Sequence, residues 1–402
     1  MAVALGRKWI LDHGGAVGIP SWYLVYTSGR ASIQCPQNFG FFQECFIFIQ
    51  RFVGPIAELV QSLRQEIYTE PYNEINWNKA RNTVVKEDLF HPHSLVQDRL
   101  WGFLYHYVEP VLARWPFSML REKALKVAIE HVHYEDTISR YICIASQEKL
   151  LSLLPRWVEE PNSEAYKCHL DRIPDYFWVS EDGAKYQSDV SRTWDAALAV
   201  QAIISCDLNS MVHENPPGNF TQMYRHMSKG GLPFFVADHG WTVSDCTAEG
   251  LKATLLLSQI SPELVGEKLD PECIYDAVNA LLSFPSNNGG FLAWEPQGAF
   301  RWLEEYFSPV EFLQDTIIEQ EHIECNSSAI QSLILFRKLY PNHRRKEVDR
   351  GICCLREELQ QQFSLYDALS PGGWVYTNLE GNRSNLVQTA WAVVFLIVAG
   401  QV

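Results

Sequence analysis

The stretch SDCTAEGLKATLLLSQI, residues 244–260, passes from small polar and acidic residues into apolar residues at helical spacing. Such a start predicts a helix with Ser244 or Asp245 as its N-cap and acids in its first turn. Glu249 follows Asp245 by four residues, so both carboxyl groups share one face of this helix. If that face is buried, lost hydration and like charge favour a protonated acid, whereas the helix dipole favours the anion. The sequence leaves this balance open.

Apolar residues recur at helical spacing through much of the chain, and alternating strand patterns are scarce. A Gly pair followed by an aromatic residue recurs between helices, as is typical of stacked helical hairpins. The sequence therefore predicts an all-α fold, an incomplete α/α toroid in which outer helices ring inner ones. The predicted helices lie at 56–67, 194–206, 250–260, 273–284, 327–340 and 385–400, and the Gly-aromatic segments at 286–294 and 369–376, with a weaker one at 181–186.

Two domains are expected, 1–180 and 181–402, because RIPDYFWVSEDG (172–183) interrupts the helical run before a new series starts at Trp194. The first is interpreted as the remnant of one α/α-barrel, and the second as the barrel that carries the acidic stretch. Residues 21–50 have no clean period and differ in composition from their neighbours. They form an atypical segment of the first domain.

The composition of the 402-residue chain is that of a globular protein, with 47% hydrophobic and 20% charged residues. A formal net charge of −15 argues against a nucleic-acid partner, which needs clustered Lys and Arg. The ten cysteines show no CxxC spacing, so reduced thiols are expected. No signal peptide and no spanning segment are expected, while attachment to a membrane surface stays open.

Two histidine-containing segments resemble metal-site material: HVHYED (131–136) and HPHS (91–94). Helical metal-binding His pairs are usually spaced i, i+4, whereas His131 and His133 are spaced i, i+2. No third ligand is identifiable. Solvated or hydrogen-bonded structural residues are therefore predicted in both segments, and no metal site. The chain also has no phosphate-binding glycine loop and no GxSxG motif.

The segment SDCTAEGLKA, preceded by DHGW, resembles the signature of the oxidosqualene cyclases, the terpene cyclase–mutase family. Further segments match that family in the same order, and the Gly-Gly-aromatic segments are similar to its QW repeats. The form AWEP (293–296) resembles plant enzymes that make pentacyclic triterpenes such as β-amyrin. The matching segments are RKWILDHGG, GIPSW, RFVGPI, NEINWNKARN, LREKALKVAIEHVHYED, RIPDYFW, GGFLAWEP, HIECNSSAIQSLILFRKLYP and NLEGNRSNLVQTAWA.

The resemblance implies a site and a reaction. Asp245 would protonate the epoxide of 2,3-oxidosqualene, with Cys246 and Cys325 orienting its carboxyl group. The carbocation would then be stabilised by aromatic faces at Trp194, Phe234 and Trp294. No metal or organic cofactor is implied. The family also implies contact with one leaflet of the endoplasmic reticulum, or with a lipid droplet, on the cytosolic face.

Several family segments are missing, including the MWCYCR-like motif expected before RFVGPI and the DGSWYGxWG segment expected before GGWVYTN. The chain therefore reads as a truncated member with internal gaps. One alternative is a catalytically inactive fragment or a non-catalytic helical scaffold. Another is a toroid of the protein prenyltransferase type, which would need a zinc-binding Asp-x-Cys pair that this sequence lacks.

Overall fold

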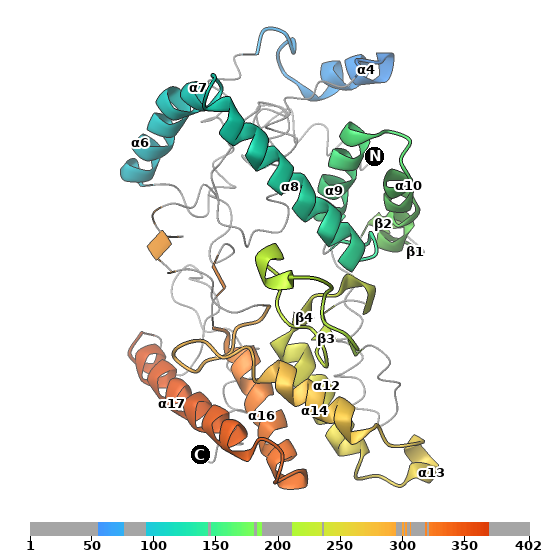
Figure 1. The fold of residues 1–402 in the computed structure, drawn as a ribbon, viewed down its shortest axis with the longest axis vertical. Helices are drawn as coiled ribbons and strands as arrows, with labels where there is room; N and C mark the ends of the chain where they lie inside the picture. The colour runs from blue at the N-terminus through green and yellow to red at the C-terminus, as the bar shows by residue number, and fades with distance from the viewer. Residues whose placement is uncertain are drawn as a thin grey trace. The chain divides into compact units, whose positions relative to one another are not determined.

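Helices dominate the computed structural model of the chain (Figure 1), which confirms the predicted all-α class. The structure describes residues 55–75, 94–143, 146–180, 183–186, 211–234, 237–294, 300, 302–303, 306, 318–319 and 321–369. The longer helices are α4 (Glu58–Ile67), α6 (Leu95–Phe103), α8 (Ser118–Ile138), α9 (Ser146–Glu159), α10 (Glu164–Asp171), α12 (Ser244–Leu257), α14 (Pro271–Leu281), α16 (Ile323–Leu339) and α17 (Arg345–Leu369). Short elements are η3 (Leu104–Val108), α7 (Glu109–Leu112), η4 (Ile173–Tyr176), η5 (Phe220–Met223), η6 (Ala237–His239) and α13 (Pro262–Val265).

The described residues divide into two compact units. The first draws on Met1–Thr137, Gln147–Ile173 and Ala299–Ile318, and the second on Ile138–Ser146, Pro174–Gly298 and Glu319–Val402. The chain thus passes from the first unit into the long central part of the second at residues 173–174. The assignment of each unit to a separate barrel stays a prediction.

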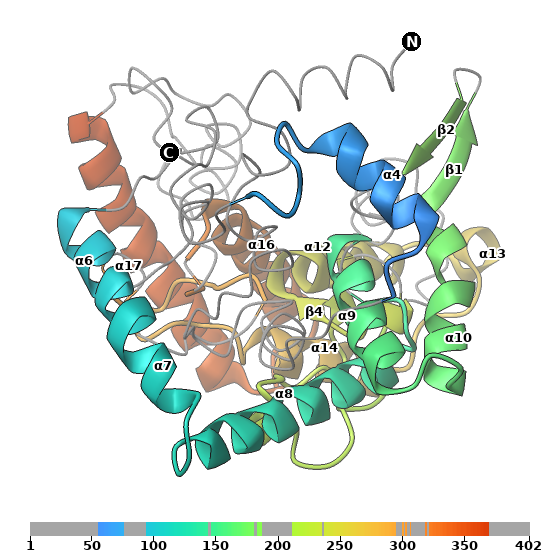
Figure 2. The same ribbon diagram turned by 90° about the horizontal axis from the view of Figure 1, so that it is seen from above.

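The hydrophobic core of the second unit lies between α12, α14, α16 and α17 (Figure 2). Three of these helices form where the apolar spacing predicts them, at 250–260, 273–284 and 327–340. Burying one such large apolar side chain contributes roughly 1.5–3 kcal/mol, so this packing determines which face each helix turns towards the core. The fully buried members include Leu255, Leu281, Phe284, Phe291, Ile330, Leu333 and Phe336.

Helix α14 shows how local sequence sets a helix start in this core. Pro271 occupies the first turn, where its missing N–H is not needed, and Asp270 caps the helix by accepting a hydrogen bond from the Glu272 N–H at 3.0 Å. On its buried face, Tyr275 stacks on His343 with ring centroids 3.9 Å apart. The helix therefore has both a defined start and a defined packed face.

Two short antiparallel hairpins accompany the helices. Strand β1 (Phe177–Ser180) pairs with β2 (Gly183–Tyr186), and β3 (Leu232–Pro233) pairs with β4 (Thr242–Val243). The sequence reading found only a break in the helical pattern at the first hairpin, because four-residue strands are too short to show a period. The second hairpin matters for the site, since β4 runs directly into helix α12.

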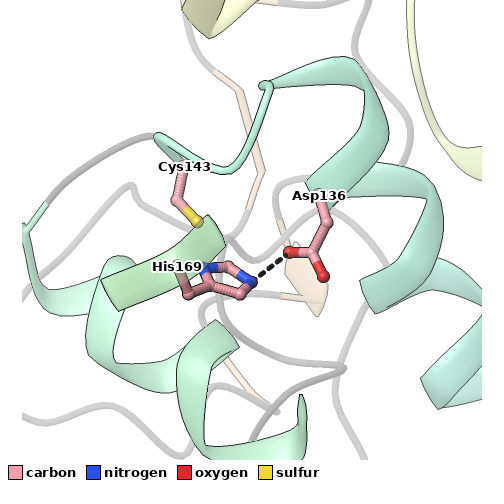
Figure 3. A group of neighbouring side chains, drawn as sticks. All are labelled: Asp136, Cys143 and His169. Atoms are coloured by element: carbon pink, nitrogen blue, oxygen red, sulfur yellow. Dashed lines mark ion pairs between the residues drawn. The ribbon is translucent and has the colours of Figure 1, made fainter. Parts of the chain in front are cut away.

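Buried charges join α8, α9 and α10 in the first unit. Asp136 accepts a hydrogen bond from Arg156 Nε at 2.6 Å, and its other carboxylate oxygen lies 3.0 Å from His169 Nε2 (Figure 3). Lys149 Nζ lies 2.9 Å from His169 Nδ1, and this lysine is fully buried. Because charges buried this deeply need partners, the network fixes the three helices against one another.

Residues 131–136 and Ser94 are the described parts of the two histidine segments, while residues 91–93 lie outside the described residues. His133 pairs with Glu159 at 2.8 Å, and burial lowers the pKa of His131. In the second segment Ser94 caps α6, and a reciprocal capping box with Gln97 completes the helix start. Hydrogen-bonded roles were predicted for both segments, and these contacts confirm them for His133 and Ser94.

Helix α4 forms where its apolar stripe predicts it, at 56–67, but that stripe is not buried. The Leu59 side chain is 69% exposed and Leu63 is 45% exposed.

Within the described residues, no helix combines the length and the apolar character needed to cross a bilayer. The seven cysteines of the described residues are free thiols, as expected.

Some predicted features lie outside the described residues. These are the atypical segment 21–50, the helices expected at 194–206 and 385–400, and all of the Gly-aromatic repeat expected at 369–376 except Leu369. Trp194 belongs to the same group.

Candidate active site around Asp245

Helix α12 starts one residue earlier than a Ser244 cap would require and two residues earlier than an Asp245 cap would require. Its N-cap is Val243, which has no side chain able to cap, so the predicted N-cap was wrong. The Ser244 hydroxyl instead donates to the Leu292 carbonyl at 2.6 Å, and the Ser244 N–H donates to the Ala293 carbonyl at 2.8 Å. Ser244 therefore attaches the first turn of α12 to the segment 291–294 and does not cap the helix.

Asp245 lies half-buried in that first turn. Burial raises its pKa from 3.8 to about 6, outweighing the hydrogen bonds from Cys246 that lower it. One of these bonds is the Cys246 N–H donated to Asp245 Oδ1 at 2.7 Å. Desolvation therefore decides the balance that the sequence left open, in favour of a carboxyl group that keeps its proton up to about pH 6.

The second carboxylate that acts on Asp245 is Glu324, not Glu249. The charge of Glu324, in the first turn of α16, also raises the Asp245 pKa. Glu249 is fully buried, but its carboxylate pairs with Lys252 Nζ at 2.8 Å. The sequence left open whether Glu249 supplies a like charge, and the like charge that raises the Asp245 pKa is that of Glu324.

Cys246 and Cys325 are brought together with Asp245 although 79 residues separate them in sequence. Both thiols are buried, and burial raises the pKa of each well above 9, with the Asp245 charge as the next cause. Cys325 also shares a side-chain hydrogen bond with Ser244. The two cysteines are therefore protonated thiols close to the carboxyl group, and their orienting role stays a prediction.

Phe234 and Trp294 lie close to each other at the start of α12. Their ring centroids are 6.1 Å apart with the planes tilted by 59°, and both pack on the apolar cluster of Leu232, Val243 and Cys246. The two predicted aromatic residues thus share a cluster with Cys246, the residue that follows the acid. Trp194, the third predicted aromatic, lies outside the described residues.

His239 borders the same aromatic pair and was not singled out from sequence. Its ring lies edge-on to Trp294 at 6.3 Å, and burial followed by the charge of Arg225 lowers its pKa to about 3. The Trp241 N–H donates to His239 Nδ1 at 3.3 Å, which leaves the proton of the neutral ring on Nε2. His239 is therefore an uncharged neighbour of the aromatic pair.

Glu319 was also missed from sequence. Its Oε1 accepts the N–H groups of Ala293 and Trp294 at 2.8 and 3.2 Å. The acidic run EQEHIE (319–324) before α16 is the signal that could have drawn attention to it, but such runs usually lie on solvated surfaces. The prediction that the site needs no metal or cofactor stays a prediction.

No family model matches the chain. It is similar to alpha-onocerin synthase of Lycopodium clavatum, with 33% identity over all of this chain and 65% of the relative. Cycloartenol synthase of Dictyostelium discoideum is 33% identical over 87% of the chain and 55% of the relative. Human lanosterol synthase is 36% identical over 92% of the chain and 55% of the relative.

The chain thus spans between about half and two thirds of the length of these relatives. The alignment with the Lycopodium protein runs over 499 positions, 97 more than the 402 residues of the chain, so that relative has segments without a counterpart here. The similarity covers both units and the residues around Asp245. The chain belongs to the oxidosqualene cyclase family of terpene cyclases.

Proposed function

We propose that this chain cyclises 2,3-oxidosqualene, acting as an intramolecular transferase in which Asp245 is the proton donor. The observation that carries the proposal is the carboxyl group of Asp245, whose pKa burial raises to about 6. An epoxide oxygen is a weak base, so its protonation needs an acid that is neutral at working pH and free of strong ion pairs. At pH 7 a group with this pKa is protonated in roughly one molecule in ten.

The first step transfers the Asp245 proton to the epoxide oxygen while the adjacent C–O bond breaks. The oxygen becomes the hydroxyl group of the product, and Asp245 is left as a carboxylate. The Cys246 N–H at 2.7 Å stabilises that carboxylate, and the thiols of Cys246 and Cys325 are the further donors proposed to orient it. Positive charge then passes to the carbon chain and moves on as each ring closes, until the last cation loses one proton and forms a carbon–carbon double bond, which leaves a neutral alcohol with the composition of the substrate.

The aromatic rings of Phe234 and Trp294 are proposed to stabilise that moving charge, together with Trp194. A ring face beside a desolvated cation contributes about 2 kcal/mol, and it does so without forming a bond to the cation. Their packing on the apolar cluster that includes Cys246 supports this role, because it places π density close to the proton donor.

The finer features of the proposal rest on family resemblance. We propose the α/α toroid as the complete fold, a pentacyclic triterpene alcohol of the plant type as the product, and the surface of the endoplasmic reticulum or a lipid droplet as the location. The AWEP form of residues 293–296 supports the product class. A water-insoluble substrate supports the location, because it partitions into lipid.

One observation favours a second candidate, a catalytically inactive member of the family. The chain lacks segments that its relatives have, and the alignment of 499 positions exceeds its 402 residues. Missing helices would open the cyclisation site to water, which quenches a carbocation. The two candidates differ in one outcome, the formation of cyclised product.

The test is expression of the chain in a yeast strain blocked in sterol cyclisation and supplied with 2,3-oxidosqualene, with the extracted lipids analysed by gas chromatography and mass spectrometry. We expect a pentacyclic alcohol from the wild type, none from Asp245→Asn, and wild-type amounts from Asp238→Asn. Asp238 is the matched control because it lies in the same stretch but pairs with Arg140 at 2.7 Å. No cyclised product from a folded wild-type chain would support the inactive candidate.

A further inference from the structure

The segment Phe291–Trp294 connects the first turns of α12 and α16 through a set of hydrogen bonds. The Phe291 N–H donates to Asn326 Oδ1 at 2.6 Å, and Ser244 donates to the carbonyls of Leu292 and Ala293. Asn326 and Ser244 lie next to Cys325 and Asp245 in their helices. The backbone that leads to Trp294 is therefore fixed by neighbours of the proposed acid site.

Glu319 accepts two further hydrogen bonds from the segment Phe291–Trp294. A single carboxylate oxygen accepts two consecutive N–H groups, from Ala293 at 2.8 Å and from Trp294 at 3.2 Å. Two hydrogen bonds that one oxygen accepts from adjacent peptides define the direction of the backbone between them. Because the Cα–Cβ bond of Trp294 follows from that direction, Glu319 controls where the indole ring can lie.

The position of the Trp294 ring matters because Phe234 lies next to it. The Trp294 ring lies 6.1 Å from Phe234, and these two rings are the described pair of the proposed cation-stabilising aromatics. A change in backbone direction at Trp294 moves one ring away from the other. Cation–π attraction falls quickly beyond about 6 Å, so a small displacement alters which carbocation is stabilised.

We propose that Glu319 is a positioning residue that sets the Trp294 indole against Phe234 and thereby determines how far cyclisation proceeds. This inference rests on the proposed cyclase function. What matters in it is the reach of the carboxylate to the two N–H groups, and not its negative charge. Reach and charge can be separated by substitution.

Three variants make that separation. Glu319→Gln keeps the reach and an acceptor oxygen but removes the charge, whereas Glu319→Asp keeps the charge and withdraws the oxygen by one methylene group. Glu321→Gln is the matched control, because Glu321 lies two residues away and accepts instead from the Ser286 hydroxyl. Each variant is expressed as the full chain, and its fold is checked by circular dichroism.

The first readout is the ratio of fully cyclised to incompletely cyclised products. We expect Glu319→Gln and Glu321→Gln to keep the wild-type ratio, and Glu319→Asp to raise the incompletely cyclised fraction several-fold. A wild-type ratio in Glu319→Asp, or a raised fraction in Glu319→Gln equal to that in Glu319→Asp, would overturn the inference. A merely structural role would lower the amount of folded protein and leave the ratio unchanged.

The second readout does not depend on activity. Amide hydrogen exchange of Ala293 and Trp294 is measured in the purified, substrate-free chain, and loss of a backbone hydrogen bond accelerates it. We expect exchange about tenfold faster in Glu319→Asp and unchanged exchange in Glu319→Gln. If the wild type forms no cyclised product, the proposed function fails, while equal exchange in Glu319→Asp and wild type would overturn the positioning role.

Discussion

The Cys325 thiol and the Asp245 carboxyl group lie close enough that the carboxylate charge raises the pKa of the thiol, although they come from the first turns of two different helices. Contact between α12 and α16 brings these two groups together, and the buried core between the helices stabilises that contact. The same burial raises the pKa of the carboxyl group. The packing of α12 against α16 thus brings the acid and its proposed orienting thiols together. The burial that results from this packing also raises the pKa of the acid.

The first prediction concerns the pH dependence of turnover. Only the protonated form of Asp245 can donate, and its pKa is about 6. We expect kcat/KM to be nearly constant below pH 6 and to fall roughly tenfold per pH unit above it. Product formation by the purified wild-type chain between pH 5 and 8 tests this, with circular dichroism at each pH to confirm folding. A rate constant independent of pH up to 8 would show that another group supplies the proton.

The second prediction concerns stability. A carboxyl group with a raised folded pKa binds its proton more tightly in the native than in the unfolded state. The stability of the wild type relative to Asp245→Asn is therefore expected to fall as pH rises from about 4 to about 6, and to be constant above that. The total change is at most about 3 kcal/mol. Urea unfolding of both proteins at several pH values measures it, and a difference that does not vary with pH would contradict it.

The third prediction concerns His226. Burial lowers its pKa to about 4, and its Nε2 lies 2.7 Å from the Ser283 hydroxyl. The unfolded chain takes up this proton near pH 6.5, so stability is lost as pH falls from about 6.5 towards 4. We expect His226→Gln to remove part of that loss, on the order of 2 kcal/mol. Unfolding free energies at pH 7 and pH 4.5 measure it, and equal losses in both proteins would contradict the prediction.

The fourth prediction concerns thiol reactivity. Cys246 and Cys325 are buried, whereas Cys353 on α17 is exposed, although its hydrogen bond with Glu357 raises its pKa. We expect iodoacetamide at pH 8 to modify Cys353 in the folded chain, and Cys246 and Cys325 only after unfolding. Peptide mass spectrometry before and after addition of denaturant reports this. Labelling of Cys325 in the native chain would mean that water reaches the acid site.

The fifth prediction concerns two glycines. A Cβ at Gly230 would lie 2.2 Å from the backbone carbon of Asp276, and Gly230 has a φ of +83°, so Gly230→Ala combines a clash with a strained backbone. We expect a loss of about 2–4 kcal/mol. Gly102 in α6 has no atom within 4 Å of such a Cβ, and Gly102→Ala should stabilise by about 0.5–1 kcal/mol. Thermal unfolding compares the two, and a loss at Gly230 no larger than at Gly102 would contradict the prediction.

The sequence predicted those features that depend on neighbouring residues. Helical spacing identified α12, α14 and α16, and the resemblance placed Asp245, Cys246 and Cys325 in one site. The wrong N-cap involves a contact between distant segments. Ser244 failed as a cap because its hydroxyl reaches Leu292, 48 residues away.

The interactions of the acidic residues with distant parts of the chain could not be predicted from sequence either. Helical geometry correctly placed Asp245 and Glu249 on one helix, but it could not show that Glu324, 79 residues further along the chain, would approach Asp245. Glu319 was missed for the same reason, because its partners Ala293 and Trp294 lie 25 or more residues before it. Local pattern identifies the reacting group, and only the fold identifies the residues that hold it in place.

The ionisation of Asp245 can be measured directly. Carboxyl carbon NMR of the chain labelled with [¹³C]aspartate, compared with labelled Asp245→Asn, isolates the Asp245 signal during a pH titration. The predicted inflection is near pH 6, the value to which burial raises this pKa. An inflection at or below the ordinary value of about 4 would show a hydrated carboxylate at this position, and the proposal of Asp245 as the proton donor would then be wrong.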